Sequence, residues 1–69
     1  TAPLKVLDVV ALLEDRPDVG LVAGQVGTIV EQLADAVFEV EFSDEEGRTY
    51  AEIALPESRL IALRCSTVV

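Results

Sequence analysis

The sequence predicts an all-β fold, a single small barrel of five short strands over residues 1–69. The apolar residues fall into five short runs, and proline, glycine or acidic residues separate each run from the next. Two of these runs alternate between apolar and polar residues, which is typical of strands with one face in water. A chain of 69 residues is enough for one domain, and closing five strands into a barrel removes the exposed edges of an open sheet.

The first strand is expected within residues 7–13. This apolar run is too short for its periodicity to distinguish a helical turn from a strand. The paired valines Val9 and Val10 favour the strand. Residues 1–5, which precede the run, are expected to be flexible.

A long loop and a glycine-containing segment connect this strand to the second one. Pro17 favours extended, loop-like backbone, so residues 15–24 are expected to form one surface loop. The second strand is expected over residues 25–33, which are rich in β-branched residues. The segment Gly-Gln-Val-Gly at its start lacks the spacing and the lysine of phosphate-binding loops, and a strand rather than a helix should follow it. We therefore expect Gly24 to take a positive φ in a tight turn and Gly27 to allow a bulge or a close crossing of strands.

The third and fourth strands are expected to form a hairpin. Residues 37–42 show the clearest alternation in the chain, with apolar side chains pointing inwards and Glu39 and Glu41 pointing outwards. A polar turn over residues 43–47 ends in glycine and leads into a second alternating run, residues 48–55.

The fourth strand should carry Tyr50 and Glu52 on its outer face. Pro56 can start a single helical or 3₁₀ turn over residues 56–59. The last short strand is then expected over residues 60–63, and residues 65–69 form a C-terminal tail.

The charge of the chain limits its partners. Thirteen acidic residues against five basic ones give a net charge of −8, which repels nucleic acid and favours a protein partner with a basic surface. Alternatively, the acids only keep a small apolar domain in solution. The chain has one cysteine and no apolar stretch long enough to span a membrane, so we expect a cytoplasmic protein without membrane contact.

The residue types make enzymatic activity improbable. The chain contains no histidine, which excludes a Cys-His nucleophile, a Ser-His-Asp triad and histidine metal ligands. A catalytic pair of carboxylates would need a concave pocket, for which a filled barrel of this size has little room. The acidic turn at residues 44–46 lacks the spacing of a calcium-binding loop. We therefore expect no catalytic, cofactor-binding or metal-binding residues.

Three groups of residues are candidates for contact with a protein partner. Val19, Leu21 and Val22 belong to the long loop and either fold onto the barrel or form a contact surface for a partner or a second copy. Glu39 and Glu41 form an acidic stripe. Tyr50 is an exposed aromatic residue suited to a contact, or it packs over a neighbouring strand with its hydroxyl group in water.

The order of these motifs resembles a known family. The segments LDVVAL, GQVGTIVE, FEVEF, GRTYA and LP, which begin at residues 7, 24, 38, 47 and 55, follow one another as in the domain-of-unknown-function family numbered 4926, small bacterial proteins of similar length. The resemblance runs from about Leu7 to Leu63 and implies no activity. It fits an SH3-like barrel with a long first loop and one 3₁₀ turn before the last strand. A five-stranded oligonucleotide-binding barrel is the alternative, but it requires a helix where this chain has only a turn.

We expect a non-enzymatic module that docks onto a larger protein. The alternative is an antitoxin- or immunity-like inhibitor whose negative charge fills the basic active site of a nuclease-like protein. A looser resemblance to the ribosome-associated KOW domains suggests nucleic-acid binding, but the chain lacks their basic residues. The sequence also leaves open whether the chain forms a homodimer.

Overall fold

The computed structural model describes residues 3–63. It confirms the all-β prediction, because the described residues form five strands and two 3₁₀ turns and no α-helix. The elements are β1 (Val9–Leu12), η1 (Pro17–Val19), β2 (Val26–Ala34), β3 (Val37–Ser43), β4 (Thr49–Pro56), η2 (Glu57–Arg59) and β5 (Leu60–Ala62). The predicted tail over residues 65–69 lies outside the described part of the chain.

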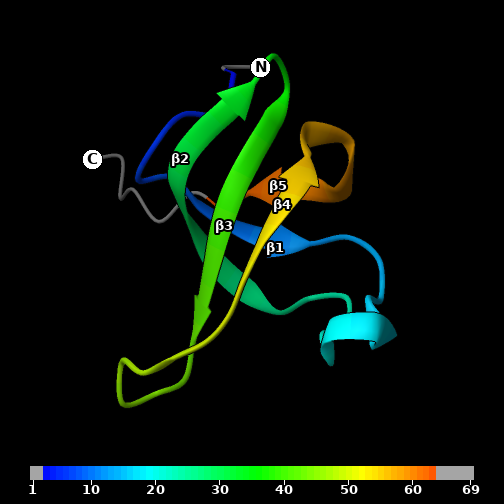
Figure 1. The fold of residues 1–69 in the computed structure, drawn as a ribbon, viewed down its shortest axis with the longest axis vertical. Helices are drawn as coiled ribbons and strands as arrows, with labels where there is room; N and C mark the ends of the chain where they lie inside the picture. Colours follow the sequence, from blue (N-terminus) through cyan, green and yellow to red (C-terminus); the bar gives the residue numbers. More distant parts are fainter. Residues whose placement is uncertain (1–2, 64–69) are drawn as a thin grey trace, which may run out of the picture.

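The five strands form one antiparallel sheet in the order β4-β3-β2-β1-β5. Figure 1 shows β1 and β5 crossing behind the long β2–β3 hairpin, so that the sheet curls around its core. The predicted closure into a barrel is not confirmed, because the sheet is not closed and β4 and β5 are its two edges. The three exposed residues of η2 connect β4 to the short strand β5, which pairs with β1.

The predicted alternation in the β3–β4 hairpin is confirmed. Phe38, Val40 and Phe42 are buried, whereas Glu39 and Glu41 between them are only half-buried. In β4, Leu55 is buried and Ile53 packs against the core.

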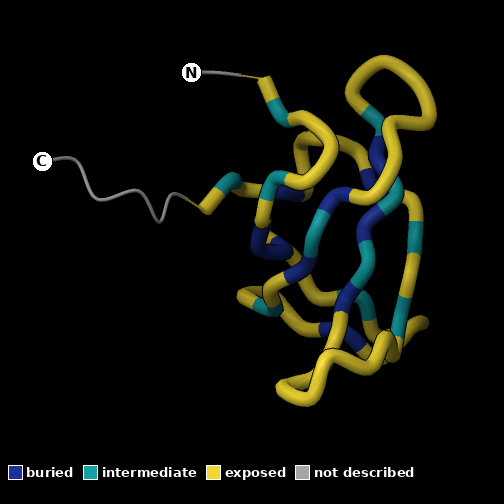
Figure 2. Tube along the Cα trace, turned by 90° about the vertical axis from the view of Figure 1, so that its left-hand side faces the viewer, coloured by how far each residue is buried: buried dark blue, intermediate teal, exposed yellow. Residues whose placement is uncertain are grey.

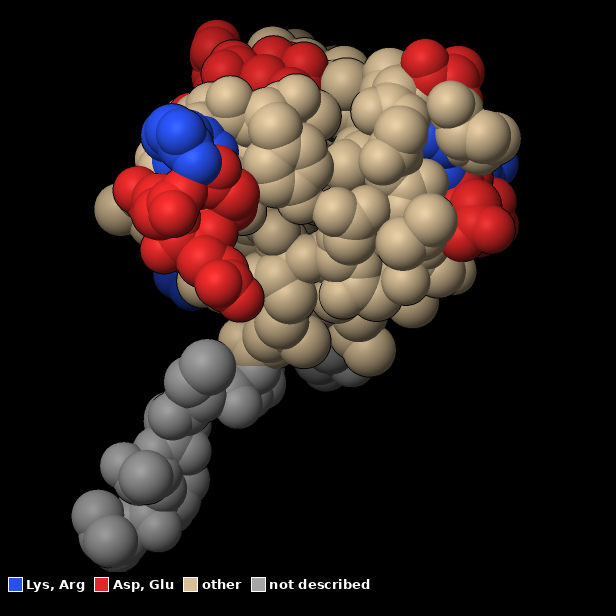
Figure 3. Space-filling model, turned by 90° about the horizontal axis from the view of Figure 1, so that it is seen from below, with Lys and Arg blue, Asp and Glu red and all other residues tan. Residues whose placement is uncertain are grey.

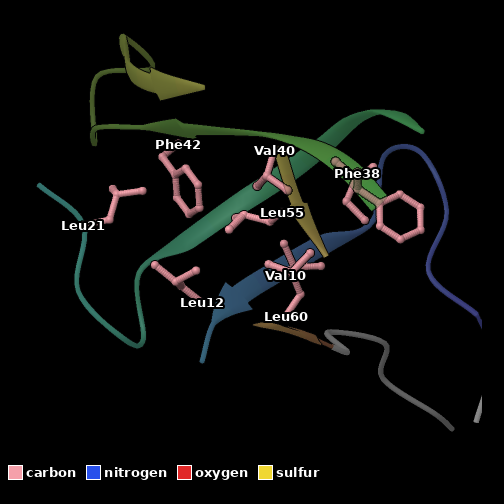
Figure 4. Packing of buried hydrophobic residues seen from close by; sticks show 9 residues of the cluster. Val10, Leu12, Leu21, Phe38, Val40, Phe42, Leu55 and Leu60 are labelled. Atoms are coloured by element: carbon pink, nitrogen blue, oxygen red, sulfur yellow. The ribbon is translucent and has the colours of Figure 1, made fainter. Parts of the chain in front are cut away.

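The core lies in the concave side of the curled sheet, and residues from all five strands contribute to it (Figure 2). Figure 4 shows how their side chains converge. Its buried members are Val10, Leu12, Leu21, Ile29, Phe38, Val40, Phe42, Leu55 and Leu60.

The first strand is shorter than predicted. Leu7 takes a positive φ of 80° and is 75% exposed, because a turn between Lys5 and Asp8 precedes the strand. The backbone N–H of Lys5 donates to Asp8 Oδ2 at 3.0 Å, and its Nζ donates to Oδ1 at 2.9 Å. Leu4 packs against the core. Within the lead that is predicted to be flexible, Leu4 and Lys5 therefore have contacts with the folded chain, and residues 1–2 are outside the described part.

The loop over residues 15–24 is folded rather than extended over the surface. It contains η1, and backbone hydrogen bonds join Arg16 and Leu21 in both directions, at 2.8 and 3.0 Å. This bridge turns Leu21 inwards, and its side chain joins Phe42 and Leu12 at one end of the core (Figure 4).

The two expectations for the glycine segment are confirmed. Gly24 has a φ of +93°, and its N–H donates to the carbonyl oxygen of Leu12 at 2.7 Å. A Cβ on Gly27 would lie 2.8 Å from Val40 Cγ1 and 2.9 Å from both Glu41 O and Phe42 Cδ2. Gly27 therefore lets β2 and β3 approach closely over the core.

Candidate protein-interaction surface

The outer face of the curled sheet changes character from one side to the other. One row of residues follows the strand register across β1, β2, β3 and β4 and consists of Val9, Thr28, Glu41 and Glu52. None of these four residues is buried. The outer face is therefore apolar on β1 and acidic on β3 and β4, with Thr28 at the border.

Four glutamates gather on the acidic side, and we name them the acidic half: Glu31, Glu39, Glu41 and Glu52. The register places Glu31 directly opposite Glu39, and Glu41 directly opposite Glu52. Like charges in directly opposed positions of a sheet repel each other and destabilise it. This arrangement therefore costs stability in the free protein.

The basic residues of the described chain pair with acids elsewhere. Lys5 pairs with Asp8, and Arg16 pairs with Asp18. Further ion pairs join Arg48 to Asp44 and Glu46, and Arg59 to Glu14. Within residues 3–63, no lysine or arginine forms an ion pair with the acidic half. The neutral hydroxyl group of Thr49 donates a hydrogen bond to Glu41 there.

Burial and the negative charge of the acidic half both change the pKa of Glu39. Burial against the sheet, a hydrogen bond with Glu52 and the negative charges of Glu52 and Glu31 raise the pKa of the Glu39 carboxyl. The folded protein therefore holds this proton more tightly than the unfolded chain, and the contribution of Glu39 to stability falls as the pH rises through this raised pKa.

Replacing Glu39 by glutamine should raise the thermal midpoint of unfolding at pH 7, because it removes the repelled charge. The difference from the wild type should shrink as the pH falls below the ordinary glutamate pKa of about 4.3, where Glu39 carries a proton in both states. Thermal unfolding followed by circular dichroism across this pH range measures the effect.

Glu45→Gln in the exposed β3–β4 turn is the matched control, since it removes the same charge away from the acidic half. Equal effects of the two substitutions at pH 7 would contradict the repulsion between opposed glutamates.

Tyr50 is 48% exposed, as predicted, but its hydroxyl group has a protein partner. It accepts a hydrogen bond from Gln25 Nε2 at 2.7 Å. Gln25 Oε1 in turn accepts a hydrogen bond from the backbone N–H of Val22 at 2.6 Å. Gln25 therefore links two of the predicted contact residues, Tyr50 and Val22, while Val19 is exposed nearby in η1.

One predicted contact residue must be corrected. Leu21 is fully buried in the core and cannot contribute to a contact surface of the folded protein. The backbone bridge to Arg16 causes this burial, and the sequence left open whether the loop would fold inwards.

A second surface was missed in the sequence analysis, and we name it the apolar half. Ala11 of β1 lies between Val26 of β2 and Ile61 of β5 in the strand register. Alternate positions along the chain extend this face. Its members are Val9, Ala11, Leu13, Val26, Ile61 and Leu63. Apart from Ala11, they are between 37% and 51% exposed.

Seen from below, part of the molecular surface carries no charged side chains (Figure 3). Figure 3 shows a broad surface without charged groups, with acidic and basic side chains only at its margins. The sequence does carry a signal for the apolar half. Residues 9–13 are all apolar, and a strand that is apolar on both sides is typical of burial on both faces.

The described residues offer no enclosed site. No pocket is found among them, and no group of three or more His, Cys, Asp or Glu side chains is placed to hold a metal ion.

In the acidic turn, Asp44 Oδ1 accepts hydrogen bonds from the backbone N–H groups of Glu46 and Arg48, at 2.9 Å each. These hydrogen bonds lower the pKa of the Asp44 carboxyl, and the bond from the Arg48 N–H has the largest effect. Over residues 3–63, no helix has the length and apolar character required to span a membrane.

Comparison with known proteins identifies one family. The family model described as a domain of unknown function, DUF4926, matches residues 6–62. The match spans all five strands. No curated protein and no solved structure matches the chain.

Proposed function

The chain belongs to the DUF4926 family, and from its surface chemistry we propose that it is a non-enzymatic protein-binding module of the cytoplasm. In this proposal the acidic half docks onto a basic surface of a larger protein. Nucleic acid is not the partner, because the net charge of −8 repels phosphate groups.

The observation that carries the proposal is the placement of like charges opposite each other. Glu31 faces Glu39 and Glu41 faces Glu52 across neighbouring strands, without an ion pair to any basic side chain in the described part of the chain. A basic partner would convert this repulsion into attraction, and complementary charge speeds association and excludes wrong partners. Exposed Tyr50 and Val22 supply apolar contact area beside the charged surface.

The same surface supports a second candidate function, inhibition of a basic, nuclease-like enzyme. Glu39 and Glu41 are two positions apart on β3 and point to the same side, and Glu52 extends the negative charge to the next strand. Such a grid of carboxylates resembles the regular negative charge of a nucleic-acid backbone. The two candidates differ in one property, which is whether the captured partner loses a catalytic activity.

A capture experiment with matched variants tests the proposal. The variant Glu39→Gln/Glu41→Gln/Glu52→Gln neutralises the acidic half. The control Asp35→Asn/Glu45→Gln/Glu57→Gln removes the same three charges from exposed positions elsewhere. We expect immobilised wild type and control to capture the same basic protein from a lysate of the organism that encodes the chain, and the first variant to lose it.

We expect the first variant to be at least as stable as the wild type, because the repelled charges are removed, and circular dichroism checks its fold. Equal capture by both variants, or capture of no basic protein by the wild type, would contradict the proposal. A nuclease assay of the captured protein, with and without the chain, separates a docking module from an inhibitor.

A further inference from the structure

We propose that the apolar half is the interface of a two-fold symmetric homodimer. The occupant of this face is a second copy of the chain, and the acidic halves of both copies stay free. The proposal does not rest on the proposed function, because the two surfaces consist of different residues.

The apolar half has the composition of an interface core. Ala11, at its centre, is only 8% exposed because Val26 and Ile61 flank it on the neighbouring strands. Val26 and Ile61 are themselves 49% and 51% exposed. A central apolar cluster without charge is what distinguishes the core of a homodimer interface from ordinary protein surface.

The charges at the margins favour a second copy over a basic partner. At one end, Arg59 Nη1 pairs with Glu14 Oε1 at 2.7 Å, next to Leu13, whose N–H donates to the carbonyl oxygen of Arg59. At the other end, Lys5 pairs with Asp8 just before β1. Each margin carries both signs, so a two-fold related copy can present the opposite sign to each group. A purely basic partner would meet charges that are already compensated.

The acidic halves of the two copies need not lie close together in this dimer, so they need not repel each other at short range. They lie on β2, β3 and β4, whereas the centre of the apolar half is β1, with β5 at the sheet edge. A two-fold axis that lies in the interface and runs parallel to β1 places the acidic halves at opposite ends of the dimer. The remaining repulsion between two chains of charge −8 acts over distance and is weakened by salt.

The size of the face predicts a reversible dimer. A standard interface buries about 800 Å² per partner. The apolar half spans only three strands, which lie about 4.8 Å apart, so we expect it to bury a smaller area. We therefore expect the dimer to be weak and to dissociate reversibly.

Sedimentation equilibrium of the full chain tests this proposal over a concentration range from about 1 μM to about 1 mM. The wild type should change from monomer to dimer. Ile61→Glu and Ile61→Lys should each weaken the dimer at least about tenfold, because either charge would be buried at the interface. Val22→Glu, at a site of similar exposure outside the apolar half, should leave it intact.

Salt gives a second readout. Raising the salt concentration from about 50 to 500 mM should tighten the dimer, because salt screens repulsion between two acidic chains, whereas it should weaken binding of a basic partner. Circular dichroism verifies the fold of each variant. A wild type that stays monomeric, or equal effects of the Ile61 variants and Val22→Glu, would overturn the proposal. So would a monomer that captures another protein through Ile61.

Discussion

Replacing Phe42 by alanine is expected to unfold a large part of the population at room temperature. Phe42 is fully buried, with Val40 and Leu21 in the same cluster. Truncating a buried phenylalanine costs about 3–5 kcal/mol, and a chain of this length has a total stability of about 3–10 kcal/mol. Urea unfolding followed by circular dichroism measures the loss.

The control for this prediction is Phe42→Leu, which keeps an apolar side chain in the site and should cost clearly less. A loss of under about 1 kcal/mol for Phe42→Ala would show that the core around Phe42 is not packed as the structure has it.

Replacing Gly27 by alanine is expected to destabilise the protein by about 1–3 kcal/mol, although alanine normally suits a strand better than glycine does. The new Cβ would lie 2.9 Å from the carbonyl oxygen of Glu41, which is main chain and cannot rotate away. The other two contacts, with Val40 and Phe42, are to fully buried side chains. Urea unfolding again provides the measurement.

Two comparisons isolate the steric cause. Gly24→Ala carries the strain of a positive φ without any atom within 4 Å of its Cβ, and should cost only about 1 kcal/mol. The double variant Gly27→Ala/Val40→Ala removes one of the three close contacts, so its loss should be smaller than the sum of the single losses by about 0.5 kcal/mol or more. A Gly27→Ala protein as stable as the wild type would contradict the close crossing of β2 and β3.

Local patterns in the sequence predicted the elements that depend on local chemistry. The alternation around Glu39 and Glu41 identified the inward and outward sides of β3, because a strand with one wet face has a period of two. The positive φ of Gly24 and the crowding at Gly27 also followed from short-range reasoning about a turn that enters a strand.

Contacts between distant residues account for the parts that were missed. Burial of Leu21 depends on its backbone bridge to Arg16 and on the position of Phe42. The sheet is open because its edge strands β4 and β5 do not pair with each other, and no local pattern encodes which strands pair. The exposure of Glu39, Glu41 and Tyr50 was predicted in outline.

The apolar half requires the topology. Val26, Ala11 and Ile61 become neighbours only when β1 lies between β2 and β5. The all-apolar run over residues 9–13 indicates two covered faces, but it does not indicate what covers the second face.

The two proposed surfaces together suggest a dimer that presents an acidic half at each end. Such a dimer would bind a partner with two basic sites more tightly than a single copy could, since the second contact forms within the same complex.

Titration calorimetry with the purified captured protein measures whether the acidic half binds a basic protein. The wild type and the control with three charges removed elsewhere should bind tightly, and their affinity should fall as salt rises. The variant without Glu39, Glu41 and Glu52 should bind at least about tenfold more weakly and depend less on salt. Equal affinity and equal salt dependence of the two variants would contradict binding through the acidic half.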